Sequence, residues 1–134
     1  MIQEQYVSFE TAKLLKDKGF NEPCICYSYG EGMNNYFSKP SIIDKANKDS
    51  GYILLPTQQM AMRWLREIHR IHIQAFCPLV DVDCDTEGIK YNVVISNLAN
   101  MCLAFDTPLE DIEYNFYEEA CEAAIKYCLV KLIK

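Results

Sequence analysis

The clearest hydrophobic pattern in the chain lies near its C-terminal end and is helical. Apolar side chains recur there every three or four residues and therefore share one helix face: Cys121, Ala124, Ile125, Cys128, Leu129 and Leu132. Asn115, with Glu118 three residues later, has the form of a helix-capping box, so the helix is expected from there to about Ile133. Its apolar face must be covered, and a small antiparallel sheet is the expected cover.

Two earlier helices are predicted by their caps. Ser8 suits the cap of a first helix, and Gly19 suits its end because glycine accepts the left-handed conformation. Thr57 suits the cap of a second helix that runs to about Arg70. The second helix is expected to turn an apolar stripe inward, made of Ala61, Trp64, Leu65 and Ile68.

Short apolar or alternating stretches predict strands at 24–29, 51–55, 71–76 and 90–96. The last two are expected to pair as neighbours through the turn-rich 81–88 link. Residues 98–105 suit a further strand or an extended edge, and Thr107, Pro108 and Glu110 suit a short turn of helix with proline at its first position. Residues 31–50 are rich in Asn, Lys, Ser and Gly and indicate a long loop or ragged hairpin.

Together these elements predict a single α+β domain over residues 1–134. The expected order is α-β-β-α-β-β-α, with an antiparallel sheet of about four strands covered by the second and third helices and with the first helix at an edge.

Charge and composition narrow the expected partners and location. The net charge of −6 opposes binding to phosphate backbones, so nucleic acid is an unlikely partner. The N-terminus has no basic segment followed by an apolar run, and no stretch approaches the length of a membrane span, so we expect a cytoplasmic protein that does not enter a membrane. The seven cysteines are odd in number and lack a disulfide framework, which favours small buried side chains over disulfides.

Neither metal nor cofactor is predicted from the residues. The segment 81–85 (DVDCD) starts like a calcium loop, but Thr86 stands where the turn needs glycine and Asn92 where a bidentate glutamate belongs. Zinc ligands of suitable type are present, but their spacing lacks the paired pattern of a zinc site: Cys24, Cys26, His69, His72, Cys77 and Cys84. The sequence also lacks the common catalytic signatures, so no catalytic residue is assigned.

Two groups of side chains are candidates for binding a partner. Arg63, Arg66 and Arg70 fall together on the outward side of the second helix and could engage phosphate or an acidic surface, although a solvated helix face is the simpler interpretation. The other group consists of aromatic residues in or beside loops, which either anchor an interface or pack over the edge of the sheet: Tyr36, Phe37, Tyr114 and Tyr117.

Three segments together carry a resemblance: 7–16 (VSFETAKLLK), 56–66 (PTQQMAMRWLR) with 71–73 (IHI), and 117–126 (YEEACEAAIK). They resemble a family of small uncharacterised proteins of Bacteroides-type gut bacteria and their phages or prophages. The resemblance covers most of the chain outside 31–50 and departs from the family pattern at 100–115. It implies an intracellular bacterial or phage setting, and it supplies no catalytic or binding residues.

The leading functional hypothesis is a non-enzymatic accessory or protein-interaction module of bacterial or phage origin, with an unknown protein partner and unknown oligomeric state. The first alternative is a small enzyme or ligand-binding domain that uses cysteine or histidine near the 31–50 loop, such as a cysteine nucleophile with His69 or His72 as base. The second is nucleic-acid contact through the arginines of the second helix.

Overall fold

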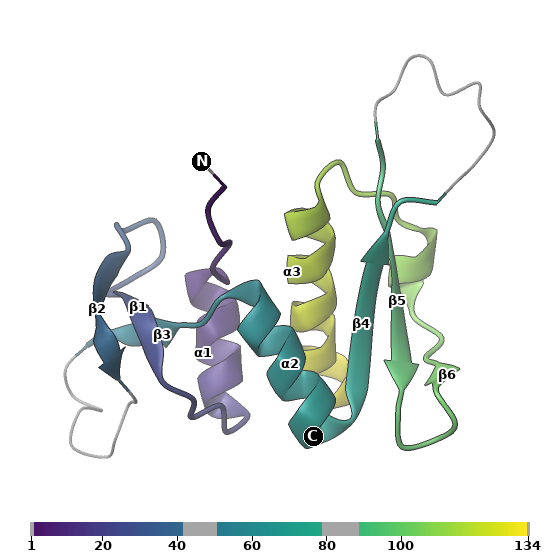
Figure 1. Cartoon of the computed structure of the whole chain (residues 1–134), viewed down its shortest axis with the longest axis horizontal. Helices are drawn as coiled ribbons and strands as arrows, with labels where there is room; N and C mark the ends of the chain where they lie inside the picture. Colours follow the sequence, from purple (N-terminus) through teal and green to yellow (C-terminus); the bar gives the residue numbers. More distant parts are fainter. Residues whose placement is uncertain (1, 42–50, 79–88, 134) are drawn as a thin grey trace.

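The chain folds as three helices between two antiparallel sheets (Figure 1). The computed structural model describes residues 2–41, 51–78 and 89–133. Its elements follow one another as α1 (Phe9–Asp17), β1 (Cys24–Ser28), β2 (Tyr36–Ser41), β3 (Ile53–Leu55), α2 (Gln58–His69), β4 (Ile71–Phe76), β5 (Asn92–Asn97), β6 (Leu103–Ala104), the 3-10 helix η2 (Pro108–Asp111), α3 (Tyr117–Tyr127) and the π-helical turn η3 (Cys128–Leu132). The predicted α+β class is confirmed.

The N-terminal sheet has the strand order β2-β1-β3 and is antiparallel throughout. Its central strand places Tyr27 opposite Tyr36 on one side and opposite Leu54 on the other. Residues that face each other across antiparallel strands point to the same side of the sheet, so these three side chains share one face.

The C-terminal sheet has the order β4-β5-β6, and the predicted pairing of 71–76 with 90–96 is confirmed by a register that runs from Ile71 opposite Asn97 to Phe76 opposite Asn92. After the short β6, the chain returns beside β5 through η2. An isolated antiparallel bridge between Tyr91 and Tyr114 closes that return, with backbone N–H···O distances of 2.8 and 2.9 Å.

Both predicted helix caps in the first half of the chain are confirmed. The Ser8 hydroxyl accepts a hydrogen bond from the Thr11 N–H at 3.2 Å, and the Thr57 hydroxyl accepts one from the Met60 N–H at 3.1 Å. Gly19 follows α1 with φ +97°, the left-handed conformation expected of a stop glycine.

The predicted start of the last helix is wrong by one residue. Phe116 is the N-cap of α3 and supplies no side-chain hydrogen bond, so no capping box forms. The Asn115 side chain instead accepts a hydrogen bond from the Lys90 ammonium group, which takes it away from the helix end. Likewise Thr107 precedes η2 without capping it through its side chain.

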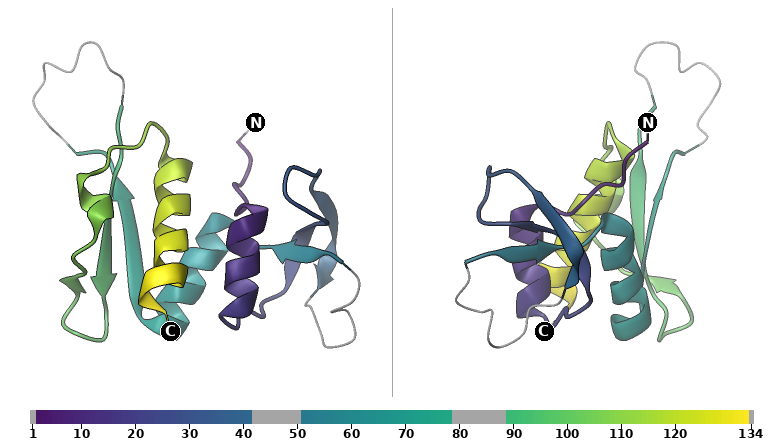
Figure 2. Two further views of the ribbon diagram at one scale, coloured as in Figure 1. Left: turned by 180° about the vertical axis from the view of Figure 1, so that it is seen from behind. Right: turned by 60° about the vertical axis from the view of Figure 1, so that its left-hand side comes forward.

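Helices α2 and α3 contact each other and both contact β4, and the two views of Figure 2 place them on one side of the β4-β5-β6 sheet. The predicted apolar face of the last helix is buried: Cys121, Ala124 and Ile125 of α3 and Cys128 and Leu129 of η3 are fully inaccessible to solvent, and Leu132 of η3 is half-buried. The stripe of α2 differs from prediction because Met62 is buried and Ile68, in the last turn, is 61% exposed.

The predicted order and the single four-stranded sheet are wrong. Two further strands are present: β2 lies within 31–50, where a ragged hairpin was one of the two interpretations, and β6 lies within 98–105, where a further strand was one expectation. The four strands of the predicted sheet are divided between two sheets. In the N-terminal sheet β1 pairs with β2 and β3, whereas β4 pairs with β5 in a second sheet on the other side of the helices. Helix α1 contacts both β3 and α3, and it lies between the N-terminal sheet and the other helices, rather than at an edge.

One hydrophobic core joins the two halves, since Leu15 of α1, Leu55 of β3, Leu65 of α2 and Ile125 of α3 belong to the same cluster. Within the residues that the structure describes, no helix combines the length and the apolar content needed to cross a bilayer.

Candidate functional site

The outward face of the N-terminal sheet carries an unusual set of aromatic residues. On β1 the small side chains of Cys24, Cys26 and Ser28 are buried, so the alternation of a strand turns Ile25 and Tyr27 to the other side. Cys26 lies in the same core cluster as Ala12 and Leu15 of α1, and α1 contacts the sheet at β3. The large residues of β1 are therefore left on the face that points away from the core.

Four tyrosines gather on this outward face, and we call them the tyrosine face: Tyr27, Tyr29, Tyr36 and Tyr52. Their contacting rings have centroids 5.4–6.2 Å apart. Tyr27 lies at the centre, stacked on Tyr36 at an interplanar angle of 25° and tilted against Tyr52 at 59°. Tyr29 is 48% exposed and Tyr36 is 43% exposed, so the outer rings remain accessible to a partner.

The rings of the tyrosine face hold one another in place. Aromatic pairs at such separations and angles contribute about 0.5–1.5 kcal/mol each beyond the area they bury. Because tyrosine has few rotatable bonds and these rings are already packed, a partner that binds them restricts little further motion. Within the described residues, none of the four hydroxyl groups is hydrogen-bonded to another group of the protein.

Of the four aromatic residues proposed from the sequence, only Tyr36 belongs to the tyrosine face. Phe37 points to the opposite side of β2, where its ring meets Tyr6 edge-on at 5.6 Å. Tyr114 and Tyr117 are half-buried against the core, and Tyr117 packs edge-on against Tyr91 at 5.9 Å. The structure thus separates Tyr36 from the other three proposed residues.

The three arginines proposed from the sequence lie along α2 and at its end. The Arg63 guanidinium donates a hydrogen bond at 3.0 Å to the carboxylate of Glu67, four residues further along α2. Both side chains are exposed, and this ion pair balances part of the charge of Arg63. Arg66 is half-buried. Arg70 is exposed, and it terminates α2 in the left-handed conformation with φ 56°.

The thiol groups inside the fold are held away from the reactive thiolate form. Burial raises the pKa of Cys24 to about 11 and the pKa of Cys128 to about 12, and it also raises the pKa values of Cys26 and Cys121. A nucleophilic cysteine requires the opposite shift. Cys77 and Cys102 are the exposed thiols among the residues with described positions.

The two histidines do not form a catalytic pair with a described cysteine. The ring of His69 packs edge-on against Trp64 at 4.6 Å, and its Nε2 atom is buried without a hydrogen-bond partner. Burial lowers the pKa of His69 and favours the neutral ring. Neither His69 nor His72 shares a hydrogen bond with a cysteine in the parts of the chain that the structure describes.

No group of three or more potential metal ligands occurs among the residues described, which are 2–41, 51–78 and 89–133. The acidic segment 81–85 and Cys84 lie outside those residues.

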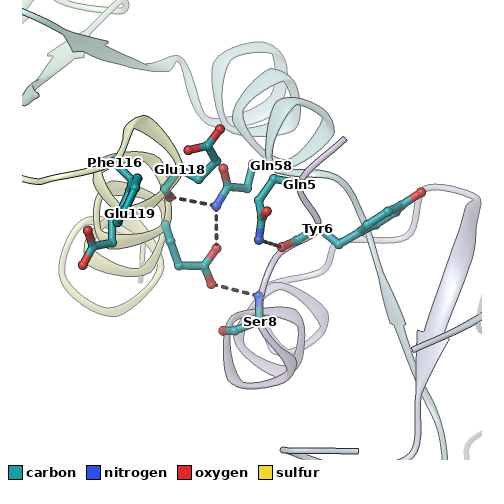
Figure 3. A pocket seen from close by; sticks show the side chains of 8 residues that line it. Gln5, Tyr6, Ser8, Gln58, Phe116, Glu118 and Glu119 are labelled. Carbon is teal, nitrogen blue, oxygen red and sulfur yellow. Dashed lines mark hydrogen bonds between the residues drawn. The ribbon is translucent and has the colours of Figure 1, made fainter. Parts of the chain in front are cut away.

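An acidic cavity of about 420 Å³ lies where the N-terminal segment meets the first turns of α2 and α3 (Figure 3). Gln58, only 3% exposed, donates hydrogen bonds to the Glu118 carbonyl at 2.9 Å and to the Glu122 carboxylate at 3.1 Å. The second oxygen of Glu122 accepts from the Ser8 N–H at 2.9 Å. The central polar groups of this cavity are thus occupied in joining α1, α2 and α3.

Comparisons of the chain with protein-family models, with curated proteins and with solved structures find no match. The tyrosine face is therefore described from its own geometry. Sequence reasoning missed Tyr27, Tyr29 and Tyr52 as surface residues, since an alternating strand does not reveal which of its faces points inward. The informative pattern is that large residues alternate with small residues along β1. If a helix covers the side with the small residues, the aromatic side is left exposed.

Proposed function

We propose that this protein is a non-enzymatic protein-interaction module that binds a partner through the tyrosine face. The observation that carries the proposal is the accessible cluster of Tyr27, Tyr29, Tyr36 and Tyr52 on a sheet whose other face packs into the core. Tyrosine is enriched among residues that dominate binding energy because it offers a large apolar surface together with a polar hydroxyl group.

The four buried thiols do not support a nucleophilic role for these cysteines. A cysteine nucleophile needs a lowered pKa and a base within hydrogen-bond reach. The pKa values of Cys24, Cys26, Cys121 and Cys128 are raised by burial, and His69 packs against Trp64 instead of a thiol.

The proposed setting is the cytoplasm of a bacterium or of a cell that carries a prophage. It is supported by the resemblance of the three sequence segments and by the free state of the described cysteines, of which Cys24, Cys26, Cys121 and Cys128 are buried. Reduced cysteines are the usual condition of cytoplasmic proteins. In this setting the module would act as an accessory protein that recruits its partner.

Site-specific photo-cross-linking in intact cells tests the proposal. A photoreactive phenylalanine analogue replaces Tyr29 in one variant and the exposed Ile68 of α2 in the matched control. The expected result is a discrete cross-linked protein from position 29 that is absent from position 68. Adding Tyr36→Ser to the position-29 variant should remove the adduct, because one of the four contact rings is lost.

Identical adducts from positions 29 and 68, or no adduct from position 29, would refute the proposed docking surface. Circular dichroism of each variant confirms that the fold is kept, which is expected because Tyr29, Tyr36 and Ile68 are all substantially exposed.

A further inference from the structure

We infer that the tyrosine face binds a proline-rich segment in the polyproline II conformation. The inference rests on the proposed function and names the chemistry of the partner. Three properties of the face lead to it: its small area, its ring geometry and its hydroxyl groups, which make no hydrogen bond within the described residues.

The accessible area of the four tyrosines and Ile25 is, by itself, too small for a stable interface with a partner domain or with a second copy of this chain. Tyr29, Tyr36 and Ile25 are 42–48% exposed, and Tyr27 and Tyr52 are half-buried. Together these five side chains offer roughly 300–400 Å² of surface. A stable protein–protein interface needs about 800 Å² from each partner. The face therefore fits a short peptide segment.

A short segment binds to so small a surface only if ordering it costs little free energy. Proline-rich sequences satisfy this condition because the proline ring fixes the backbone in the polyproline II conformation before binding. A flexible peptide would lose about 1–2 kcal/mol of backbone entropy for each residue that is ordered on binding, a cost that a preformed polyproline II segment largely avoids.

The shape of the face suits such a segment. Three of its ring pairs meet nearly perpendicularly, at interplanar angles of 74–80°, so the surface has ridges and is not a flat stacking platform. Ile25 and Tyr27 of β1 and Tyr29 just after its end mark out one line, and residues 25–29 span about 13 Å in an extended chain. About four residues of polyproline II, which rises about 3.1 Å per residue, cover that length.

The polar groups are also complementary. No hydrogen bond joins the hydroxyl groups of the four tyrosines to another described residue, and a tyrosine hydroxyl is a hydrogen-bond donor. A polyproline II segment exposes carbonyl acceptors, and its prolines contribute no N–H donors. The face is neutral, and the chain carries a net charge of −6, which disfavours single-stranded nucleic acid as the occupant of these rings.

Selection from a phage-displayed library of random peptides tests the inference. The full chain serves as bait, and the Tyr29→Ser/Tyr36→Ser double variant serves for counter-selection. The expected peptides contain prolines at a spacing of three, which repeats once per turn of polyproline II. Fluorescence anisotropy with a selected peptide should show a loss of affinity of about tenfold or more for Tyr29→Ser. It should show a smaller loss for Tyr29→Phe, which keeps the ring and removes the donor, and no change for Ile68→Ser.

Replacing the prolines of the selected peptide by alanine separates the inference from the proposed function. A loss of affinity of about tenfold or more is expected. Peptides that depend on Tyr29 and Tyr36 but keep their affinity without proline would overturn the inference and leave the docking surface intact. If the protein binds oligothymidylate, or forms a dimer in sedimentation experiments, and Tyr29→Ser abolishes that behaviour, the inference is also overturned. Selection of no peptide that depends on these tyrosines would overturn the inference, and the photo-cross-link from position 29 then decides the proposed function separately.

Discussion

At the scale of single residues, His69 is a group whose protonation opposes the fold. Its Nε2 atom is buried without a partner, and burial lowers its pKa below the ordinary value of 6.5. The unfolded chain therefore binds a proton more readily than the folded chain. The contribution of His69 to stability is complete above about pH 6.5 and is lost as the pH falls through the folded pKa.

We predict that the free energy of unfolding, measured with urea, falls between about pH 7.5 and about pH 5.5 and that His69→Gln reduces this fall. Trp64 is the only tryptophan, so quenching of its fluorescence by the protonated imidazole gives a second measure, with a midpoint below pH 6.5. His72→Gln is the matched control. A pH dependence that survives His69→Gln unchanged would show that other groups cause it.

The cysteines also give a residue-scale prediction. Iodoacetamide at about pH 8 should modify Cys77 and Cys102 within minutes, because both are exposed. Cys24 and Cys128, whose pKa values are raised by burial to about 11 and about 12, should be protected until the chain unfolds. Peptide mass spectrometry distinguishes the sites. Rapid labelling of Cys128 in the native protein would contradict the packing of η3 described above.

At the scale of elements, Glu122 joins three helices. Its carboxylate accepts hydrogen bonds from the Ser8 N–H at the start of α1 and from the Gln58 amide at the start of α2. Glu122→Ala removes both acceptors, and we expect it to lower the free energy of unfolding by about 1–3 kcal/mol. Glu119→Ala, an exposed carboxylate on the same turn, should change it by less than about 0.5 kcal/mol. Equal effects of the two substitutions in urea denaturation would show that the bridge contributes nothing.

Elements were predictable from sequence where a local signal was sufficient. The caps Ser8 and Thr57 and the apolar face of α3 depend on nearest neighbours along the chain, and all are present in the structure. The start of α3 was not predictable because Lys90, distant in sequence, binds Asn115. The strand at 36–41 lies in a polar segment for which the sequence allowed either a loop or a ragged hairpin. Residues 36–39 are exposed, so burial imposes no alternating apolar pattern on them.

At the scale of the whole molecule, the number of sheets could not be read from the chain. Alternation along 24–29 and 71–76 predicts strands, but partner choice depends on where the helices lie, and three helices separate the two sheets. The same arrangement of helices and sheets determines which side chains form the candidate site. Tyr36 was proposed as a loop residue, whereas it belongs to a surface that exists only because Cys24, Cys26 and Ser28 face the core.

The most direct test of the docking surface is NMR of the protein with ¹³C-labelled tyrosine rings, titrated with a peptide selected as above. The chain has nine tyrosines, which report on both the tyrosine face and the opposite end of the molecule. The account predicts that ring signals of Tyr27, Tyr29, Tyr36 and Tyr52 shift on binding and that those of Tyr91, Tyr114 and Tyr117 remain in place. Shifts confined to the latter three would contradict it.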